Sequence, residues 1–85
     1  MSRHYLVELY LPSRGSPALG ELGQRARAAA AAVTREGTPV RYLRSIYVPR
    51  DETCFVLYEG VSAEAVRHAS SRAAIACDRI VEALT

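Results

Sequence analysis

The stretch PRDETCFVLYEGVSAEAVRHASSRA, residues 49–73, carries the signals that decide the fold of this chain. It begins with a charged turn, continues as a nearly unbroken apolar and aromatic run, and ends that run on the carboxylate of Glu59. Such runs, bounded by turn residues, are typical of strands, and a serine just before an apolar helical pattern is typical of a helix N-cap. The stretch therefore predicts a turn, a buried strand over residues 53–59 and a helix capped by Ser62.

The segments on either side of this stretch complete the pattern. Residues 40–48 (VRYLRSIYV) predict a strand that forms a hairpin with residues 53–59, and residues 4–11 (HYLVELYL) and 78–84 (DRIVEAL) predict two more strands. After the first strand, Ser16 and Pro17 indicate a helix start, and apolar residues recur at helical spacing as far as residue 36. Gly37 stands where a left-handed residue commonly ends a helix. We therefore expect a helix over residues 18–36.

The order of these elements is strand, helix, strand, strand, helix, strand. This order is typical of the ferredoxin-like α+β fold, the split βαβ unit. Right-handed crossovers then favour a four-stranded antiparallel sheet in the order 4-1-3-2, with both helices on one face. The second face of the sheet stays uncovered, and an open apolar face in a small domain indicates a partner surface or the wall of a pocket.

Length and composition narrow the class of protein. The 85 residues form one domain over residues 1–85, which is marginally stable alone, so a homodimer is expected. The eleven basic residues are all arginines and are scattered, which predicts no nucleic-acid partner. The absence of a long apolar run predicts a cytoplasmic protein without membrane attachment. Cys54 and Cys77 begin strands that the first strand separates, too far apart for a disulfide.

The acidic residues of the strands indicate where a site lies. Side chains alternate across a sheet, and a carboxylate is costly beneath helices, so Glu8, Glu59 and Glu82 are expected to face away from the helices together. His4 is expected near Glu59 and Glu82, at the end of the sheet where the third strand finishes. An arginine of the second strand, either residue 41 or residue 44, is expected to reach the same face.

Three interpretations of this face remain open. The acids pair with arginines at a wet or dimeric interface; or His4, Glu59 and Glu82 hold a divalent metal; or the face forms a pocket for a small ligand. The pocket residues would be Glu8, Tyr10, Arg44, Tyr47, Phe55 and Glu59, with Tyr42 as a further wall. No catalytic motif is found, so the expected function is ligand or metal binding. The alternatives are an isomerase-type or monooxygenase-type enzyme of the dimeric ferredoxin-like barrels, by fold analogy, and a non-catalytic interaction module.

Three segments carry a resemblance to a known family: YLVELYLP at 5–12, VRYLRSIYVPRDETCFVLYEG at 40–60 and SAEAVRHASSRAAIACDRIVEAL at 62–84. Together they resemble a family of small bacterial nickel-binding proteins, long described as a domain of unknown function. The resemblance implies a ferredoxin-like fold, a homodimer and nickel binding through histidine and carboxylate side chains. Of the carboxylates that it implies, Glu59 and Glu82 are present in this chain.

Overall fold

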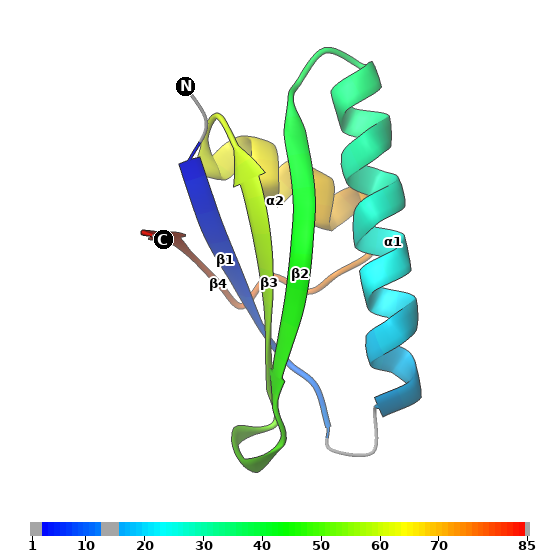
Figure 1. Cartoon of the computed structure of the whole chain (residues 1–85), viewed down its shortest axis with the longest axis vertical. Helices are drawn as coiled ribbons and strands as arrows, with labels where there is room; N and C mark the ends of the chain where they lie inside the picture. Colours follow the sequence, from blue (N-terminus) through cyan, green and yellow to red (C-terminus); the bar gives the residue numbers. More distant parts are fainter. Residues whose placement is uncertain (1–2, 13–15, 85) are drawn as a thin grey trace.

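The computed structural model describes residues 3–12 and 16–84, and the side chains of residues 16–18 lie outside this description. The predicted βαββαβ order is confirmed (Figure 1). The elements are β1 (Arg3–Tyr10), α1 (Ser16–Arg35), β2 (Val40–Val48), the 3₁₀ turn η1 (Pro49–Asp51), β3 (Thr53–Gly60), α2 (Ala63–Arg72) and β4 (Arg79–Ala83). Helix α1 begins at residue 16, two residues before the predicted start, and its predicted side-chain cap by Ser16 lies outside the described residues. No helix in the described ranges is long and apolar enough to cross a membrane.

The four strands form one antiparallel sheet in the order β2-β3-β1-β4, which is the predicted order read from the opposite edge. Strand β1 lies between β3 and β4, and each of its residues from His4 to Glu8 therefore has a partner on both sides. Directly paired residues in an antiparallel sheet share a face. The pairing register thus fixes which side chains lie together, without any assumption about strand parity.

One face of the sheet is covered by both helices and forms the core. Alternate residues of β1 and β3 point into the core and pack against small or aliphatic residues of the helices. The core contains Tyr5, Val7, Leu9, Cys54, Val56 and Tyr58 from the strands, Leu22, Ala26, Ala30 and Val33 from α1, and Val66 and Ala69 from α2. Fully burying a valine such as Val7 contributes about 1.5–3 kcal/mol. The alanines allow both helices to lie close to the sheet. Both helices lie on the same side of it, so no helix or strand of the described residues covers the other face (Figure 1).

The end of α1 is fixed by backbone and side-chain hydrogen bonds. Gly37 adopts a φ of 108°, as predicted for a left-handed residue, and its N–H donates to Thr34 O while Thr38 N–H donates to Val33 O. The Thr34 hydroxyl donates to Val40 O at 2.7 Å and accepts from Val40 N–H at 3.0 Å. These bonds hold the first residue of β2 against the last turn of α1.

Helix α2 begins as the sequence predicts. The Ser62 side chain accepts a hydrogen bond from Ala65 N–H at 3.2 Å, which confirms its role as N-cap. At the other end, the Arg72 guanidinium donates to both carboxylate oxygens of Glu36, at 2.8 and 3.0 Å. This bond lowers the pKa of Glu36 and joins the two helix ends.

Both cysteines are free, and burial raises the pKa of the Cys54 thiol, as expected of a core residue.

Strand β2 contains a β-bulge at Leu43. Tyr42 pairs with Tyr58, but the next paired residue is Arg44, opposite Leu57, so Leu43 is extra in the ladder. A bulge of this kind shifts the alternation of side chains by one residue. Both sides of the bulge then keep a basic side chain on the uncovered face of the sheet, at Arg41 and at Arg44.

Candidate functional site

The uncovered face of the sheet, called the open face below, is the candidate site. The register places side chains from all four strands on it, in these rows: Arg41, Glu59, His4 and Ala83; then Arg44, Leu57, Leu6 and Val81; then Ile46, Phe55, Glu8 and Arg79; then Val48, Thr53 and Tyr10. The first three rows cross the sheet from β2 to β4, and the fourth ends at β1. The arrangement separates a polar row, an apolar centre and a second set of charged groups.

The centre of the open face is apolar, although no other element covers it. It is formed by Leu6, Ile46, Phe55, Leu57 and Val81, which adjoin one another across the four strands. Leu57, on the inner strand β3, is 8% exposed, while Ile46, on the edge strand β2, is 47% exposed. Side-chain alternation in the sequence predicts that Leu6 and Leu57 share a face with the acids, but neither was named as a site residue. Ile46 was not named either, because the sequence does not settle the facing of the second strand, and Val81 was expected on the opposite face, which is the same error as that made for Glu82.

Charged pairs lie on two sides of this apolar centre. Arg41 Nη2 lies 3.1 Å from Glu59 Oε1, and Arg79 Nη1 lies 3.8 Å from Glu8 Oε2. The carboxylate side chains are only 28% and 30% exposed, whereas their arginines are 69% exposed. Exposed ion pairs contribute about 0–1 kcal/mol each, so these pairs orient charge more than they stabilise the fold. Acid–arginine pairing, as one interpretation of the sequence expected, is therefore present within a single chain.

Glu82 does not join the other acids, and the expectation that it shares their face is wrong. It pairs with Tyr5, which points into the core, so it lies on the opposite side of the sheet from Glu8 and Glu59. The premise that a carboxylate cannot lie on the helix-covered side fails here, because β4 is the outer strand and Glu82 remains 47% exposed. Arg3 Nη1 reaches it at 3.7 Å.

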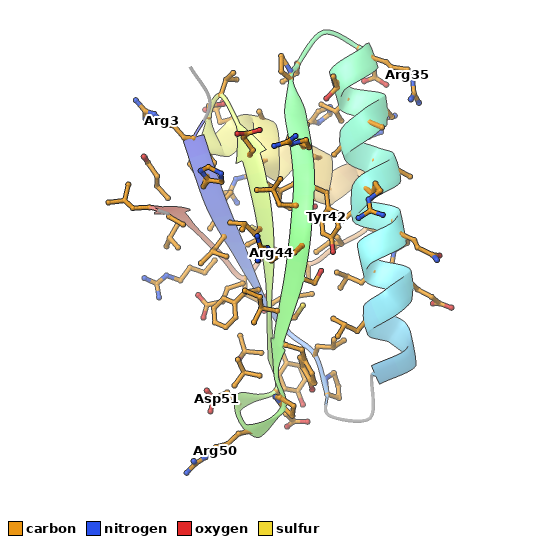
Figure 2. The ribbon with its side chains drawn as sticks, viewed as in Figure 1. Arg3, Arg35, Tyr42, Arg44, Arg50 and Asp51 are labelled. Atoms are coloured by element: carbon orange, nitrogen blue, oxygen red, sulfur yellow. The ribbon has the colours of Figure 1, made fainter. Side chains whose placement is uncertain are left out.

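Two of the expected pocket walls also face the other way. Tyr47 pairs with the core residue Cys54, and its hydroxyl donates to Leu11 O at 2.7 Å, so it is not part of the open face. Tyr42 likewise lies on the helix-covered side, and Figure 2 shows it between β2 and α1 while Arg44 points away from the helix. Of the other expected pocket residues, Tyr10 and Phe55 lie on the open face with Arg44, Glu8 and Glu59.

The expected metal ligands come together only in part. His4 and Glu59 are directly paired on the open face, whereas Glu82 lies behind it. Within residues 3–12 and 16–84, no group of three histidine, cysteine, aspartate or glutamate side chains is placed to hold a metal ion. Two donors, one of them already paired with Arg41, do not complete a coordination shell for nickel. A single copy of the chain therefore does not fit a resident metal.

A small hollow of about 160 Å³ lies at the other end of the open face, beside Glu8. Asp78 lines it and accepts a hydrogen bond from Tyr10 N–H at 2.9 Å, while Arg79 forms its rim. Pockets that enclose a substrate commonly measure about 300–1,000 Å³. The hollow is too small to enclose a substrate in one copy of the chain.

The fold and the open face define a class: a ferredoxin-like α+β domain with one uncovered sheet face. The family model of the nickel-responsive SCO4226-like proteins matches residues 5–83, and the chain belongs to that family. The crystal structure of SCO4226 from Streptomyces coelicolor A3(2) superposes with a TM-score of 0.70 at 28% identity, covering 94% of each chain. No curated protein matches the sequence.

Proposed function

We propose that the chain is a homodimeric ligand-binding protein in which the open face of one copy closes against that of a second. The observation that carries this proposal is the uncovered apolar centre formed by Leu6, Ile46, Phe55, Leu57 and Val81. Apolar area removed from water stabilises an association by about 25 cal/mol per Å², before the costs of association. An exposed apolar patch with a polar rim is typical of an interface between proteins.

The charged pairs beside the apolar centre support a symmetric contact. In a two-fold dimer the same patch meets itself, so every arginine has a glutamate of the second copy available as well as its own. Arg41 and Arg79 are more exposed than the acids they contact, which leaves guanidinium N–H groups free to donate across the interface. The open face carries three arginines, at 41, 44 and 79, and two glutamates, at 8 and 59, so the charge that opposes self-association is a single excess arginine per copy.

Sedimentation velocity tests the dimer with a matched pair of variants. Ile46 on the open face and Val61 in the turn between β3 and α2 are 47% and 46% exposed. We expect the wild type and Val61→Lys to sediment as dimers at micromolar concentration and Ile46→Lys as a monomer with an unchanged circular dichroism spectrum. A wild type that stays monomeric up to about 100 µM, or two variants that behave alike, would falsify the proposal.

We further propose that the ligand is a divalent metal held by donors from both copies. His4 and Glu59 supply an imidazole and a carboxylate at one end of the open face, and membership of the nickel-responsive family supports nickel among the candidates. Imidazole suits nickel, and carboxylate oxygens suit divalent ions generally. Two copies supply four donors where one supplies two, so this proposal rests on the dimer.

Calorimetric titration with nickel chloride tests the metal, separately from the dimer. We expect heat of binding for the wild type, and at least about tenfold weaker binding for His4→Gln and for Glu59→Gln. His68→Gln is the matched control, since His68 is exposed on α2. A dimer that gives no heat, or a His68→Gln variant that loses as much binding as His4→Gln, rejects the metal while leaving the dimer standing.

A further inference from the structure

A second cavity lies outside the open face, between α1 and the edge strand β2. This α1–β2 groove measures about 460 Å³ and is lined by Arg27, Ala30, Ala31, Thr34, Arg35, Val40, Arg41 and Tyr42. Its size falls within the range of small-molecule sites. The helix residues recur at the spacing of one α-helical face, and both Ala30 and Val40 are buried and form an apolar floor.

Beside the groove, a guanidinium lies against an aromatic ring. The Arg27 guanidinium carbon lies 5.3 Å from the centroid of the Tyr42 ring. That ring is itself held in place, because it packs edge to face on Tyr58 at 6.1 Å and its hydroxyl is hydrogen-bonded to Ser45 at 2.8 Å. Gly23 leaves the space that the hydroxyl occupies, since a β-carbon there would lie 3.0 Å from it. The Tyr42 ring is therefore held by contacts on two sides, and it offers the Arg27 guanidinium a surface beside the groove.

The charge of the groove is unbalanced. Arg27, Arg35 and Arg41 line it, and no acidic side chain does so within the described part of the chain. Arg41 is paired with Glu59, but none of the ion pairs between described residues involves Arg27 or Arg35. Figure 2 shows Arg35 directed outward from the end of α1, whereas the Arg27 guanidinium lies against the ring of Tyr42, which also lines the groove.

We propose that the α1–β2 groove binds a small organic anion with an apolar or aromatic body. The carboxylate of such a ligand accepts hydrogen bonds from the Arg27 guanidinium. The contact with the face of the Tyr42 ring leaves the N–H groups at the edge of the guanidinium free to donate. The apolar body lies on the floor formed by Ala30, Ala31 and Val40. The groove shares Arg41 with the open face, but its floor and Arg27 lie outside that face, so the proposal does not depend on the dimer or the metal.

Titration followed by ¹⁵N–¹H NMR tests this site with 4-phenylbutyrate as the probe. We expect shifts confined to amides of residues 27–35 and 40–42. The neutral analogue 4-phenylbutan-1-ol measures the contribution of charge and should bind at least about tenfold more weakly. Shifts on the open face outside residues 40–42, or equal binding of the acid and the alcohol, would overturn the assignment.

Two matched pairs of variants locate the binding energy. Arg27→Gln removes one positive charge from the groove, and the control Arg50→Gln removes one from the exposed η1 turn. Only Arg27→Gln should weaken 4-phenylbutyrate binding, by about tenfold. Ala31→Leu fills the groove, while Ala28→Leu makes the same change on a side of α1 that does not line it; only the first should block binding. Equal effects within either pair contradict the site.

The remaining alternative for this groove is an extended acidic peptide laid along the free edge of β2. A hexapeptide of glutamate and leucine residues, added under the same conditions, distinguishes the two ligands. If it shifts the amides of residues 27–35 and 40–42 and 4-phenylbutyrate does not, the small-anion assignment is wrong. If 4-phenylbutyrate alone shifts them, the assignment holds.

Discussion

Glycine at position 23 has a low helix propensity, but it leaves room in α1 for the side chain of Tyr42. A β-carbon at Gly23 would lie 3.0 Å from the Tyr42 hydroxyl oxygen, whereas one at Gly20 would meet nothing within 4 Å. Tyr42 cannot easily retreat, because its ring packs on Tyr58 and its hydroxyl is hydrogen-bonded to Ser45. The two glycines look alike in the sequence pattern, and only the structure separates their roles.

We expect the two glycine-to-alanine variants to change stability in opposite directions. Gly20→Ala should raise the free energy of unfolding by about 0.5–1 kcal/mol, because alanine favours the helix and restricts the unfolded chain. Gly23→Ala gains the same propensity but overpacks Tyr42, at a cost of about 1–3 kcal/mol, so a net decrease is expected. Urea denaturation measures both, and an equal gain for the two variants would show that Tyr42 moves freely.

Two hydroxyl groups in the core have no hydrogen-bond partner among the described residues, Tyr58 Oη and Ser70 Oγ. Both side chains are fully buried. Burial raises the pKa of the Tyr58 phenol, and the neighbouring Ser70 hydroxyl lowers it in part, although the two do not meet hydrogen-bond geometry. A buried hydroxyl without a partner costs about 1–3 kcal/mol in lost hydration.

Phenylalanine substitutions at two tyrosines test this cost. Tyr58→Phe removes an unsatisfied hydroxyl, so the free energy of unfolding should stay level or rise by about 1 kcal/mol. Tyr47→Phe removes a hydroxyl that donates to Leu11 O at 2.7 Å, and a loss of about 1 kcal/mol is expected. Chemical denaturation at neutral pH compares them; a loss at Tyr58 as large as that at Tyr47 would indicate a buried water bonded to Tyr58.

The raised pKa of Tyr58 also predicts how its contribution depends on pH. A phenol whose folded pKa lies above its ordinary value of 10.0 stabilises the fold fully below that pH. The contribution is lost as the pH rises through the folded pKa, because the unfolded chain then releases the proton more readily. Tyr58→Phe should therefore flatten the alkaline decline in stability above pH 10, relative to the wild type.

Among the structural elements, β2 depends most on one irregularity. The bulge at Leu43 keeps Arg41 and Arg44 on the open face while Tyr42 and Ser45 lie on the helix-covered side. In a regular strand, residues three apart face opposite ways, and Arg44 would lie beneath the helices. Deleting Leu43 makes the ladder regular without changing the face of any of these four residues.

We expect deletion of Leu43 to be tolerated and deletion of Ser45 to be damaging. Without Ser45, the strand has two options. It either keeps the bulge, which moves every later residue of β2 to the opposite face of the sheet, or it loses the bulge and places Arg44 opposite Val56 in the core. Burying an unpaired charge costs several kcal/mol, more than a small domain has to spare. Thermal unfolding followed by circular dichroism compares the two deletions, and equal losses would show that the bulge itself is required.

The strands also show where sequence reasoning succeeds and fails. For β1 and β3, apolar alternation is unambiguous, and the faces assigned to Glu8 and Glu59 are the observed ones. For β4, the apolar residues Ile80 and Val81 fit either face, and the premise that acids avoid the helices selected the wrong one for Glu82. The bulge in β2 has no glycine or proline to mark it, so the sequence left Arg41 and Arg44 as alternatives when both lie on the open face.

At the scale of the whole chain, the topology was predictable because turn residues and helix caps divide the sequence into six elements. The groove between α1 and β2 was not, because it depends on how closely the helix lies to the edge strand, which no periodicity encodes. The occupant proposed for the open face would likewise be set by contacts outside the chain. An 85-residue domain leaves a large share of its apolar surface exposed, so association changes its stability directly.

Self-association through the open face would make the thermal stability of the protein depend on its concentration. If two copies unfold together, the unfolding midpoint rises with protein concentration, because dilution favours separate unfolded chains. Two chains of 85 residues, at about 2.1 cal/mol/K per residue, have an unfolding entropy of about 0.36 kcal/mol/K. A tenfold increase in concentration is worth about 1.5 kcal/mol near the midpoint, so a rise of about 4 °C is expected.

Scanning calorimetry or circular dichroism across a hundredfold range of concentration measures this shift, which should total about 8 °C for the wild type and for Val61→Lys. Ile46→Lys should melt lower and at one temperature throughout, because a charge on the open face prevents the contact while leaving the core of each chain intact. A wild-type midpoint that does not move with concentration means that each chain unfolds alone. The apolar centre of the open face would then have to be stable in water without a second copy.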